Sequence, residues 1–447
     1  MINPRGTAVK VLKQVLDNNA YSNVVLSMYL NKENLDRKDR ALVTELVYGT
    51  LRYKYTIDSI LDSFIKSDIG KMDGDILNIL RMSVYQLRYL SKIPEFAVVN
   101  EAVELSKRKS VKLSKLVNGV LRNYLRNKDT LTCEHKGDKM SRWCFKYSFS
   151  RWMAELFITQ YGEKTGESIL KNSNIVPKVT VRVNTLKIKY EQVWNELIKN
   201  GYDVKEGTIC KEALIIKKGS NIELNPLFKK GYITVQDESS MLVAHVMDLE
   251  ENMTVLDLCS APGGKSCHIA ELMKNTGKVY ACDLHANKMS LVKENASRLG
   301  VENLIYNVFD AEKYIGQFEN AADRVLIDVP CSGLGIIRKK PEIKWTKNKD
   351  SMDNLVKIQR NIMLNASKYV KQEGKLIYST CTLNKVENNE NINWFIQKNP
   401  QFKLEKINFG DFENIIYDEK GYITVLPNDN MDGFFKINYI FKISKIY

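Results

Sequence analysis

The sequence predicts a multidomain chain: an all-α helical bundle, a small α+β segment and a doubly wound α/β domain. Across residues 1–130, apolar residues recur with the 3.6-residue period of amphipathic helices. Residues 145–237 mix strand-like and helical pieces, which is typical of a small α+β unit. From residue 238 to 447, short β-branched strands alternate with helix-length segments, as in a mainly parallel sheet. We therefore expect three domains with these bounds.

The helical bundle is predicted from three amphipathic segments, "RALVTELVYGTLR", "DILNILRMSVYQLRYL" and "KLSKLVNGVLRNYLR". Residues 1–140 contain 24 Lys and Arg against 16 Asp and Glu, in a chain of net charge +14. Such an excess of positive charge favours an acidic partner such as RNA. The candidate contacts are Lys107, Arg108, Lys109, Lys112 and Lys115. Taken singly, each of them is as well explained as an ordinary solvent-exposed charge on a helix.

The composition excludes several classes of protein. With 44% hydrophobic and 27% charged residues, the chain is ordinary for a globular protein. The eight cysteines form no CxxC pair and the four histidines show no ligand spacing, so we expect no metal. We see neither the apolar run of a membrane span nor that of a signal peptide. We expect a cytoplasmic monomer with reduced thiols and no membrane partner.

The strands of the last two parts are predicted in chain order. In the middle segment, "KVTVRVNTLKI" and "ALIIKKG" flank the helix "YEQVWNELIKNG". In the last domain the strands are "TVLDLC", "KVYACDL", "NLIYNVFD", "RVLIDVPC" and "KLIYSTC", followed by "GYITVLP" and "FFKINYIFKI". In a doubly wound sheet, the carboxyl ends of the parallel strands open on one ligand crevice.

The turn "LCSAPGGKSCHIA" follows the first of these strands and resembles a phosphate-binding loop. A Walker A loop needs its first glycine at position 259, which is Cys259 here. The loop also contains Pro262, which has no backbone N–H for a phosphate. The dinucleotide pattern G-x-G-x-x-G is absent as well. The turn therefore predicts neither a triphosphate nor a dinucleotide.

Three features in series predict a different ligand. The turn at Gly263 and Gly264 leads into a helix whose free N–H groups suit a carboxylate. Asp283 ends the second strand, 20 residues after Gly263, at the spacing of a ribose contact. Asp310 ends the third strand, where it can meet an adenine amino group. A ligand with a carboxylate, a ribose and an adenine but no phosphate is S-adenosylmethionine.

Two cysteines end the fourth and fifth strands, which are neighbours in the common strand order. They are Cys331 in "IDVPCSG" and Cys381 in "YSTCTLN". A thiolate that adds to carbon 6 of cytosine makes carbon 5 nucleophilic enough to accept a methyl group. Asp328 is placed to hydrogen-bond the cytosine edge, and Lys265 would favour ionisation of a nearby thiol. These residues predict methylation of cytosine.

Longer motifs resemble known families. The segments "ALVTELVYGTLR", "IPEFAVVNEAVELSK" and "LVNGVLRNYLR" resemble the NusB family of helical RNA-binding domains. The series "DLCSAPGGKSCHIA", "IDVPCSGLGIIRKKPEIKW", "IYSTCTLNKVENNE" and "DGFFKINY" is similar to the motifs of RNA cytosine-5 methyltransferases. From end to end, the chain is similar to the RsmB family, also called Sun, which methylates 16S ribosomal RNA of the small subunit.

The resemblance implies a role for each motif residue. Cys381 would be the nucleophile, Cys331 would assist release of the methylated RNA, and Asp328 would act at the cytosine. The implied cofactor site comprises Cys259, Ser260, Ala261, Pro262, Gly263, Gly264, Lys265, Asp283, Asp310 and Asp328. The implied partner is 16S ribosomal RNA. Alternatives are the same chemistry on transfer RNA or another ribosomal site, and a non-catalytic RNA-binding assembly factor.

Two further segments are candidates for RNA contact. "RKKPEIKW" places four cations beside a tryptophan, either as an RNA-contacting loop or as a surface loop with a packed indole. Its residues are Arg338, Lys339, Lys340, Lys344 and Trp345. In the middle segment, "TVRVNT" with Arg182 and "VQDESS" at 235–240 resemble the small RNA-binding segment that precedes the catalytic domain in this family.

Overall fold

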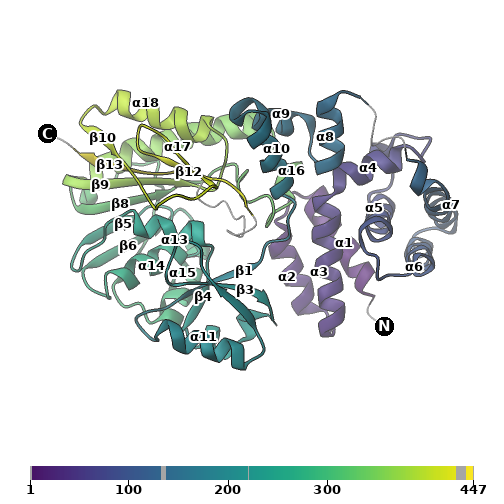
Figure 1. Ribbon diagram of the computed structural model, residues 1–447, viewed down its shortest axis with the longest axis horizontal. Helices are drawn as coiled ribbons and strands as arrows, with labels where there is room; N and C mark the ends of the chain where they lie inside the picture. Colours follow the sequence, from purple (N-terminus) through teal and green to yellow (C-terminus); the bar gives the residue numbers. More distant parts are fainter. Residues whose placement is uncertain (1–2, 132–136, 220, 429–438, 446–447) are drawn as a thin grey trace. The chain divides into compact units, whose positions relative to one another are not determined.

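The computed structural model describes residues 3–131, 137–219, 221–428 and 439–445 (Figure 1). Its contacts divide it into two compact units. Unit 1 comprises Met1–Asn174 together with Lys340–Lys347, and unit 2 comprises Ile175–Lys339 together with Asn348–Tyr447. Unit 1 therefore takes one short piece from the middle of unit 2's sequence.

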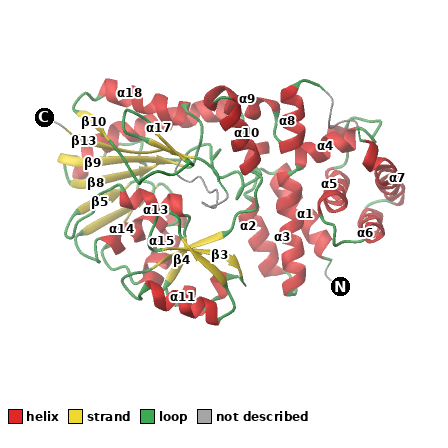
Figure 2. Ribbon diagram, in the orientation of Figure 1, coloured by secondary structure: helices red, strands yellow, loops and turns green. Residues whose placement is uncertain are grey.

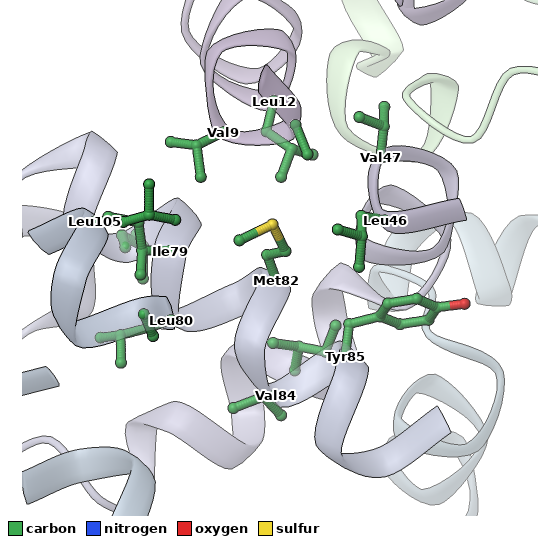
Figure 3. Packing of buried hydrophobic residues seen from close by; sticks show 14 of the residues in the cluster. Val9, Leu12, Leu46, Val47, Ile79, Leu80, Met82, Val84, Tyr85 and Leu105 are labelled. Atoms are coloured by element: carbon green, nitrogen blue, oxygen red, sulfur yellow. The ribbon is translucent and has the colours of Figure 1, made fainter. Parts of the chain in front are cut away.

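Unit 1 is built from helices and loops in its described residues (Figure 2). Its α-helices are α1(Pro4–Asp17), α2(Ser22–Lys32), α3(Arg37–Arg52), α4(Lys54–Asp62), α5(Gly74–Tyr89), α6(Glu95–Lys107), α7(Val111–Asn127), α8(Lys139–Tyr147), α9(Arg151–Tyr161), α10(Glu163–Asn172) and α16(Ile343–Thr346). The predicted apolar stripes pack against one another, with Leu12, Leu46 and Met82 meeting between α1, α3 and α5 (Figure 3). The predicted helical bundle is confirmed.

Side-chain caps set where two of the central helices begin. Asp36 precedes α3 and accepts a hydrogen bond from the backbone N–H of Asp39 at 2.7 Å. Asp73 precedes α5 and accepts from the backbone N–H groups of Asp75 and Ile76. Each cap satisfies amide groups that the first helical turn leaves without a partner.

The segment 340–347 is anchored in unit 1 by a buried lysine. The Lys344 side chain is 2% exposed, and its Nζ donates to the carbonyls of Arg52 at 3.1 Å and Ser148 at 2.9 Å. It also donates to Asn174 Oδ1 at 2.7 Å. Burial lowers the pKa of the Lys344 ammonium well below its usual value. The lysine thus joins three segments of unit 1 that are distant in sequence.

Two neighbours of Lys344 complete this anchor. Glu342 is buried, and its carboxylate accepts from the backbone N–H of Ser22 at 3.0 Å and from the Ser22 hydroxyl at 2.7 Å. This caps the first turn of α2, where a negative charge is favourable. The indole N–H of Trp345 donates to the carbonyl of Leu51 at 2.8 Å.

The predicted RNA-contacting loop therefore has a different role. Arg338 and Lys344 are each only 2% exposed, so the RNA-contact interpretation is wrong for both. Lys339 pairs with the buried Asp237 at 3.2 Å. Trp345 packs against the helical core, as the alternative interpretation predicted. The ammonium group of Lys344 can be buried here because backbone carbonyls and the Asn174 side chain accept its hydrogen bonds.

Unit 2 begins with a small antiparallel sheet of order β2-β3-β1-β4. Its strands are β1(Val179–Val183), β2(Asp203–Glu206), β3(Ala213–Lys218) and β4(Ile233–Val235), and its helices are α11(Tyr190–Lys199) and α12(Pro226–Lys229). The two predicted strands appear as β1 and β3, and the predicted helix appears as α11. The small α+β part of the fold is confirmed. The short strands β2 and β4 were not predicted.

The second sheet of unit 2 has nine strands in the order β11-β12-β13-β9-β8-β5-β6-β7, with β10 beside β13. They are β5(Thr254–Asp257), β6(Lys278–Asp283), β7(Leu304–Val308), β8(Ala322–Asp328), β9(Val370–Thr380), β10(Phe402–Glu405), β11(Ile415–Tyr417), β12(Ile423–Val425) and β13(Tyr439–Lys445). From β9 to β7 all neighbours are parallel. The predicted doubly wound sheet is confirmed.

Helices cover both faces of this sheet (Figure 1). One face carries α13(Glu238–His245), α14(Gly264–Leu272) and α15(Ala286–Leu299), and the other carries α17(Lys349–Tyr369) and α18(Asn391–Lys398). Strand β5 pairs with β6 on one side and β8 on the other, so the strand order reverses there. Ligands of such sheets bind at the carboxyl ends of the strands beside this reversal.

Some predicted features cannot be placed in the fold. Most of the motif "DGFFKINY", residues 432–438, lies outside the described residues, as does Cys133. The last predicted strand is described only as β13, which runs antiparallel to β9. Among the helices described, none combines the length and the hydropathy needed to cross a membrane.

Candidate active site

A cavity of about 270 Å³ opens at the carboxyl ends of the parallel strands in unit 2. Five predicted cofactor residues line it, namely Cys259, Ala261, Asp283, Asp310 and Asp328. The other lining residues are Leu258, Leu284, His285, Lys288, Ala311, Glu312, Pro330, Ile358 and Ile362. The remaining predicted cofactor residues are outside this lining and build the turn into α14: Ser260, Pro262, Gly263, Gly264 and Lys265.

The turn requires glycine at position 263. Gly263 has φ +99°, a backbone conformation that residues with a side chain rarely adopt. A Cβ atom there would also lie 3.0 Å from a side-chain carbon of Val292 on α15. The Gly263 N–H donates to the carbonyl of Ser260 at 2.7 Å, which closes the turn, and α14 begins at the next residue.

Asp283 and Asp310 are held by backbone amides. Asp283 accepts from the N–H of Ala261 at 3.3 Å and from the N–H of His285 at 3.0 Å. Asp310 accepts from the N–H of Glu312 at 3.0 Å. Ionised carboxylates only accept hydrogen bonds, so this part of the cavity suits a ligand with hydroxyl and amino donors. A ribose and an adenine carry such donors, so the residues fit S-adenosylmethionine.

Asp328 ends β8 and connects the cavity to the cysteines. Its Oδ2 forms an ion pair with Lys265 Nζ, and the Ser379 hydroxyl donates to its Oδ1 at 2.8 Å. Ser379 lies two residues before Cys381 in β9. Lys265, which was predicted to favour a thiolate, is thus bound to a carboxylate.

The structure brings the two predicted cysteines together. Strands β8 and β9 pair in parallel, and the Sγ atoms of Cys331 and Cys381 lie 2.8 Å apart as free thiols. The backbone N–H of Cys381 also donates to Cys331 Sγ at 3.2 Å. Burial, Cys381, Glu387 and Asp328, in that order, raise the pKa of the Cys331 thiol well above its usual value. Cys331 therefore keeps its proton at neutral pH and can donate it toward the Cys381 sulfur.

The carboxylate of Glu387 organises the loops that carry both thiols, a role the sequence did not predict. Glu387 is fully buried and accepts from the N–H of Ser332 at 2.9 Å and from the Ser332 hydroxyl. It also accepts from Asn384 Nδ2 at 3.1 Å and Gln359 Nε2 at 2.9 Å. Ser332 follows the first cysteine, and Asn384 lies three residues after the second. The only sequence signal was the polar run "ENNE" within a motif.

Arg182 supports the other side of the site from the small sheet. It is fully buried, and its guanidinium donates to the Glu271 carboxylate from Nε at 3.1 Å and from Nη2 at 2.7 Å. Its Nη1 donates to the carbonyl of Gly264 at 3.1 Å. Gly264 and Glu271 are both in α14, so Arg182 fixes the helix that follows the glycine turn. It is not available to RNA at this position.

Three family models match the chain. The model described as 16S rRNA methyltransferase RsmB/F matches residues 244–440. The model of the NusB family matches residues 2–126, and that of the RsmF/B-like ferredoxin-like domain matches residues 149–223. The matches therefore follow the order of helical bundle, small sheet and large sheet.

Relatives and solved structures agree with these matches. A protein of Bacillus subtilis (strain 168), described as probable ribosomal RNA small subunit methyltransferase B, is 39% identical over 438 residues, which cover 96% of this chain and 97% of the relative. A Synechocystis protein with the same description is 33% identical, covering 98% and 99%. The structure of PH0851 covers 100% of this chain and 99% of its own at 26% identity and a TM-score of 0.83. A methyltransferase homologue from Pyrococcus horikoshii covers 70% and 100% at 26% identity and a TM-score of 0.57.

Proposed function

The chain belongs to the RsmB family of 16S ribosomal RNA methyltransferases, and from that premise we propose that it methylates carbon 5 of a cytidine through a covalent bond to Cys381. The observation that carries this proposal is the contact of 2.8 Å between the Cys331 and Cys381 sulfurs. This pair follows two neighbouring strands of the sheet, and Asp328 ends the first of them. A methyltransferase without a thiol intermediate has no chemical need for such a pair.

S-adenosylmethionine is the methyl donor of this class of enzyme, and when bound it supplies an electrophilic methyl group. We assign Asp283 to its ribose hydroxyls and Asp310 to its adenine amino group, because both present carboxylate oxygens in the cavity. The assignment of the glycine turn to its carboxylate rests on the N-terminus of α14, which favours negative charge.

The cytosine ring reacts first with the thiolate of Cys381. The sulfur forms a bond to carbon 6, which makes carbon 5 nucleophilic. S-adenosylmethionine, held by Asp283, Asp310 and the glycine turn, would supply the methyl group to carbon 5 and leave as its neutral thioether. The carbon 5 proton then passes to solvent water, and its electron pair expels the Cys381 sulfur from carbon 6, which restores the aromatic ring and the thiolate. Asp328, held by Lys265 and Ser379, accepts a hydrogen bond from the exocyclic amino group throughout.

Cys331 acts in the last step of this scheme. Its thiol keeps its proton because its pKa is raised, and it lies within hydrogen-bond distance of the Cys381 sulfur. A donated hydrogen bond stabilises the departing thiolate, which favours release of the methylated RNA. The target cytosine must be unpaired or flipped out of its stack to reach this position.

The proposal is tested with 16S ribosomal RNA that carries 5-fluorocytidine. Fluorine cannot leave as a proton does, so wild-type protein with S-adenosylmethionine should remain bonded to the RNA and run as a retarded band on a denaturing gel. Cys381→Ala should give no band and lose turnover by about 10⁴-fold or more. Cys331→Ala should instead accumulate a covalent adduct with unmodified RNA, because release is impaired.

Other outcomes would correct the proposal in different ways. An adduct that persists with Cys381→Ala and disappears with Cys331→Ala would exchange the two roles. Methylation of ordinary RNA without any trapped band would exclude the thiol mechanism. Transfer RNA that carries the same analogue is the specificity control. A stronger band with transfer RNA than with 16S ribosomal RNA would mean that transfer RNA is the substrate.

A further inference from the structure

Unit 1 contains a cavity of about 570 Å³ between the junction of α3 and α4, the last turn of α5, and α8. We propose that this cavity binds an unpaired nucleotide of the RNA substrate, with its base against aromatic rings and its phosphate beside guanidinium and ammonium groups. The proposal rests on RNA being the substrate and names where the helical unit holds it. All of the lining residues belong to unit 1.

The walls of the cavity are aromatic. The rings of Tyr53 and Tyr89 stack with centroids 4.2 Å apart and planes inclined by 16°. Tyr85 extends this stack, with its ring centroid 5.4 Å from that of Tyr89. Trp143 and Phe145, both nearly buried, line the cavity from α8. Flat aromatic faces bind bases of any identity by stacking, which is how proteins hold single-stranded RNA.

The cations of the cavity complement these walls. Arg88, Arg142 and Lys146 line it, and its described lining contains no acidic residue. The Arg88 guanidinium lies 5.8 Å from the ring centroid of Tyr89, in the range of a cation–π contact. The Lys146 side chain is 64% exposed, and its Nζ lies 3.6 Å from Glu167. Such an exposed pair is weak and exchanges readily for a phosphate.

The other basic surface of the unit is neutralised in part by its own carboxylates. Lys109 Nζ lies 2.6 Å from Asp73 and 2.7 Å from Asp75, so two carboxylates hold it. These contacts compensate the charge of Lys109, which the sequence had made a candidate for RNA contact. Because the cavity combines stacking faces with cations and has no lining carboxylate, it is the better site for a nucleotide.

The test compares RNA binding by three double variants of the full-length chain. Arg142→Gln with Lys146→Gln removes two cations of the cavity, and Lys164→Gln with Lys171→Gln removes two exposed cations of α10 as the matched control. Lys107→Gln with Lys112→Gln removes two cations from the other basic surface of unit 1, which is the alternative RNA-binding site. The dissociation constant for 16S ribosomal RNA is measured by filter binding at several salt concentrations, without cofactor.

We expect the cavity variant to raise the dissociation constant about tenfold, which is about 1.4 kcal/mol. The slope of log affinity against log salt should become shallower by about 0.7, because each neutralised phosphate of a single strand contributes roughly 0.7 and the cavity holds one. The control variant should change the dissociation constant less than twofold. Equal losses in the cavity variant and the control would overturn the proposal, and so would a loss confined to Lys107→Gln with Lys112→Gln.

A second pair of variants tests stacking separately from charge. Tyr89→Leu should raise the dissociation constant about tenfold with the salt slope unchanged, and Tyr89→Phe should bind as the wild type does. Thermal unfolding identifies a variant that fails to fold, in which case the charge variants decide. If no cavity variant changes RNA binding, the nucleotide assignment is wrong. That is the result expected if the cavity binds an acidic peptide instead.

These measurements are independent of methyl transfer. If the 5-fluorocytidine trap fails with wild-type protein while the cavity variants still lose RNA affinity, the cysteine mechanism is wrong and the cavity stands. If the trap succeeds while the cavity variants bind RNA normally, the cavity proposal alone is wrong.

Discussion

The two halves of the active site differ in the charge that they hold at rest. In the cofactor half, Asp283 and Asp310 accept hydrogen bonds from backbone amides. In the thiol half, Cys331 contacts Cys381 beside the carboxylate of Glu387, and the pKa of the Cys331 thiol is raised. The cofactor half therefore offers acceptors to a ligand before it binds. The thiol half is neutral at Cys331 and must develop negative charge during the reaction.

Asp328 belongs to both halves, and after the nucleophile Cys381 its replacement should have the largest effect on turnover. Asp328→Asn removes the partner of Lys265 and the proposed contact to the cytosine. We expect kcat to fall about 10²- to 10³-fold, as when one preorganised polar group is removed. Single-turnover methyl transfer at saturating RNA and S-adenosylmethionine measures this. Asp310→Asn is the matched variant and should raise the cofactor dissociation constant about tenfold, with kcat changed less than threefold. If Asp328→Asn and Asp310→Asn lower kcat equally, the two halves do not have separate roles.

Glu387→Gln should disrupt the thiol half alone. Four donors converge on the two carboxylate oxygens, so an amide must turn its own NH₂ toward some of them. We expect a loss of about 3 kcal/mol in the free energy of unfolding in urea. Because the charge of Glu387 raises the pKa of Cys331, alkylation of that thiol should also begin at lower pH.

The control for this variant is Glu390→Gln, whose exposed side chain lies three residues after Glu387. It should change the free energy of unfolding by less than about 0.5 kcal/mol. If Glu387→Gln is equally mild and leaves the alkylation profile unmoved, the buried carboxylate does not organise the thiol loops.

Asp257 is an exception in the cofactor half, and replacing it should have an effect that depends on pH. It is buried at the end of β5, its Oδ2 accepts from the Ser266 hydroxyl at 2.6 Å, and burial raises its pKa to about 7. In the unfolded chain its pKa is about 3.9. The stability that protonated Asp257 contributes is thus complete below about pH 4 and is lost as the pH rises through 7.

The asparagine of Asp257→Asn is uncharged at every pH, so the variant should not lose this stability as the pH rises. The difference in free energy of unfolding between variant and wild type should shift in favour of the variant by up to about 4 kcal/mol between pH 4 and 8, because the pKa of Asp257 differs by about 3 units between the folded and the unfolded chain. Urea unfolding at intervals of one pH unit measures it. A difference that stays constant would mean that Asp257 is ionised in the folded protein.

The residues at the ends of the parallel strands could be predicted from the sequence. The buried polar groups that hold the loops and segments together could not. Asp283 and Asp310 were found because each ends a β-branched strand, and such ends meet at one edge of a sheet. Cys331 and Cys381 were paired for the same reason. Glu387 was missed and Lys344 was assigned to an RNA-contacting or surface loop, because a charged residue in a polar run has the pattern of a solvated surface. Only tertiary hydrogen bonds distinguish the two cases, and these have no period along the chain.

The short strands escaped prediction for a related reason. β4 has three residues and β2 has four, too few to show an alternation, and their pairing with β1 and β3 defines them. The domain order could be predicted, but the inclusion of Lys340–Lys347 in unit 1 could not, because neighbouring sequence belongs to unit 2.

The anchor at 340–347 has a consequence for biosynthesis. On the ribosome, the helices up to Asn174 emerge long before Lys344, which hydrogen-bonds three of their segments. At about 5–20 residues per second, the intervening sequence takes on the order of 10–30 s to translate. Although unit 1 is N-terminal, it completes its structure only after most of unit 2 has been made. In a nascent chain stalled before residue 340, the carbonyls of Arg52 and Ser148 and the side-chain oxygen of Asn174 should therefore still be accessible to water.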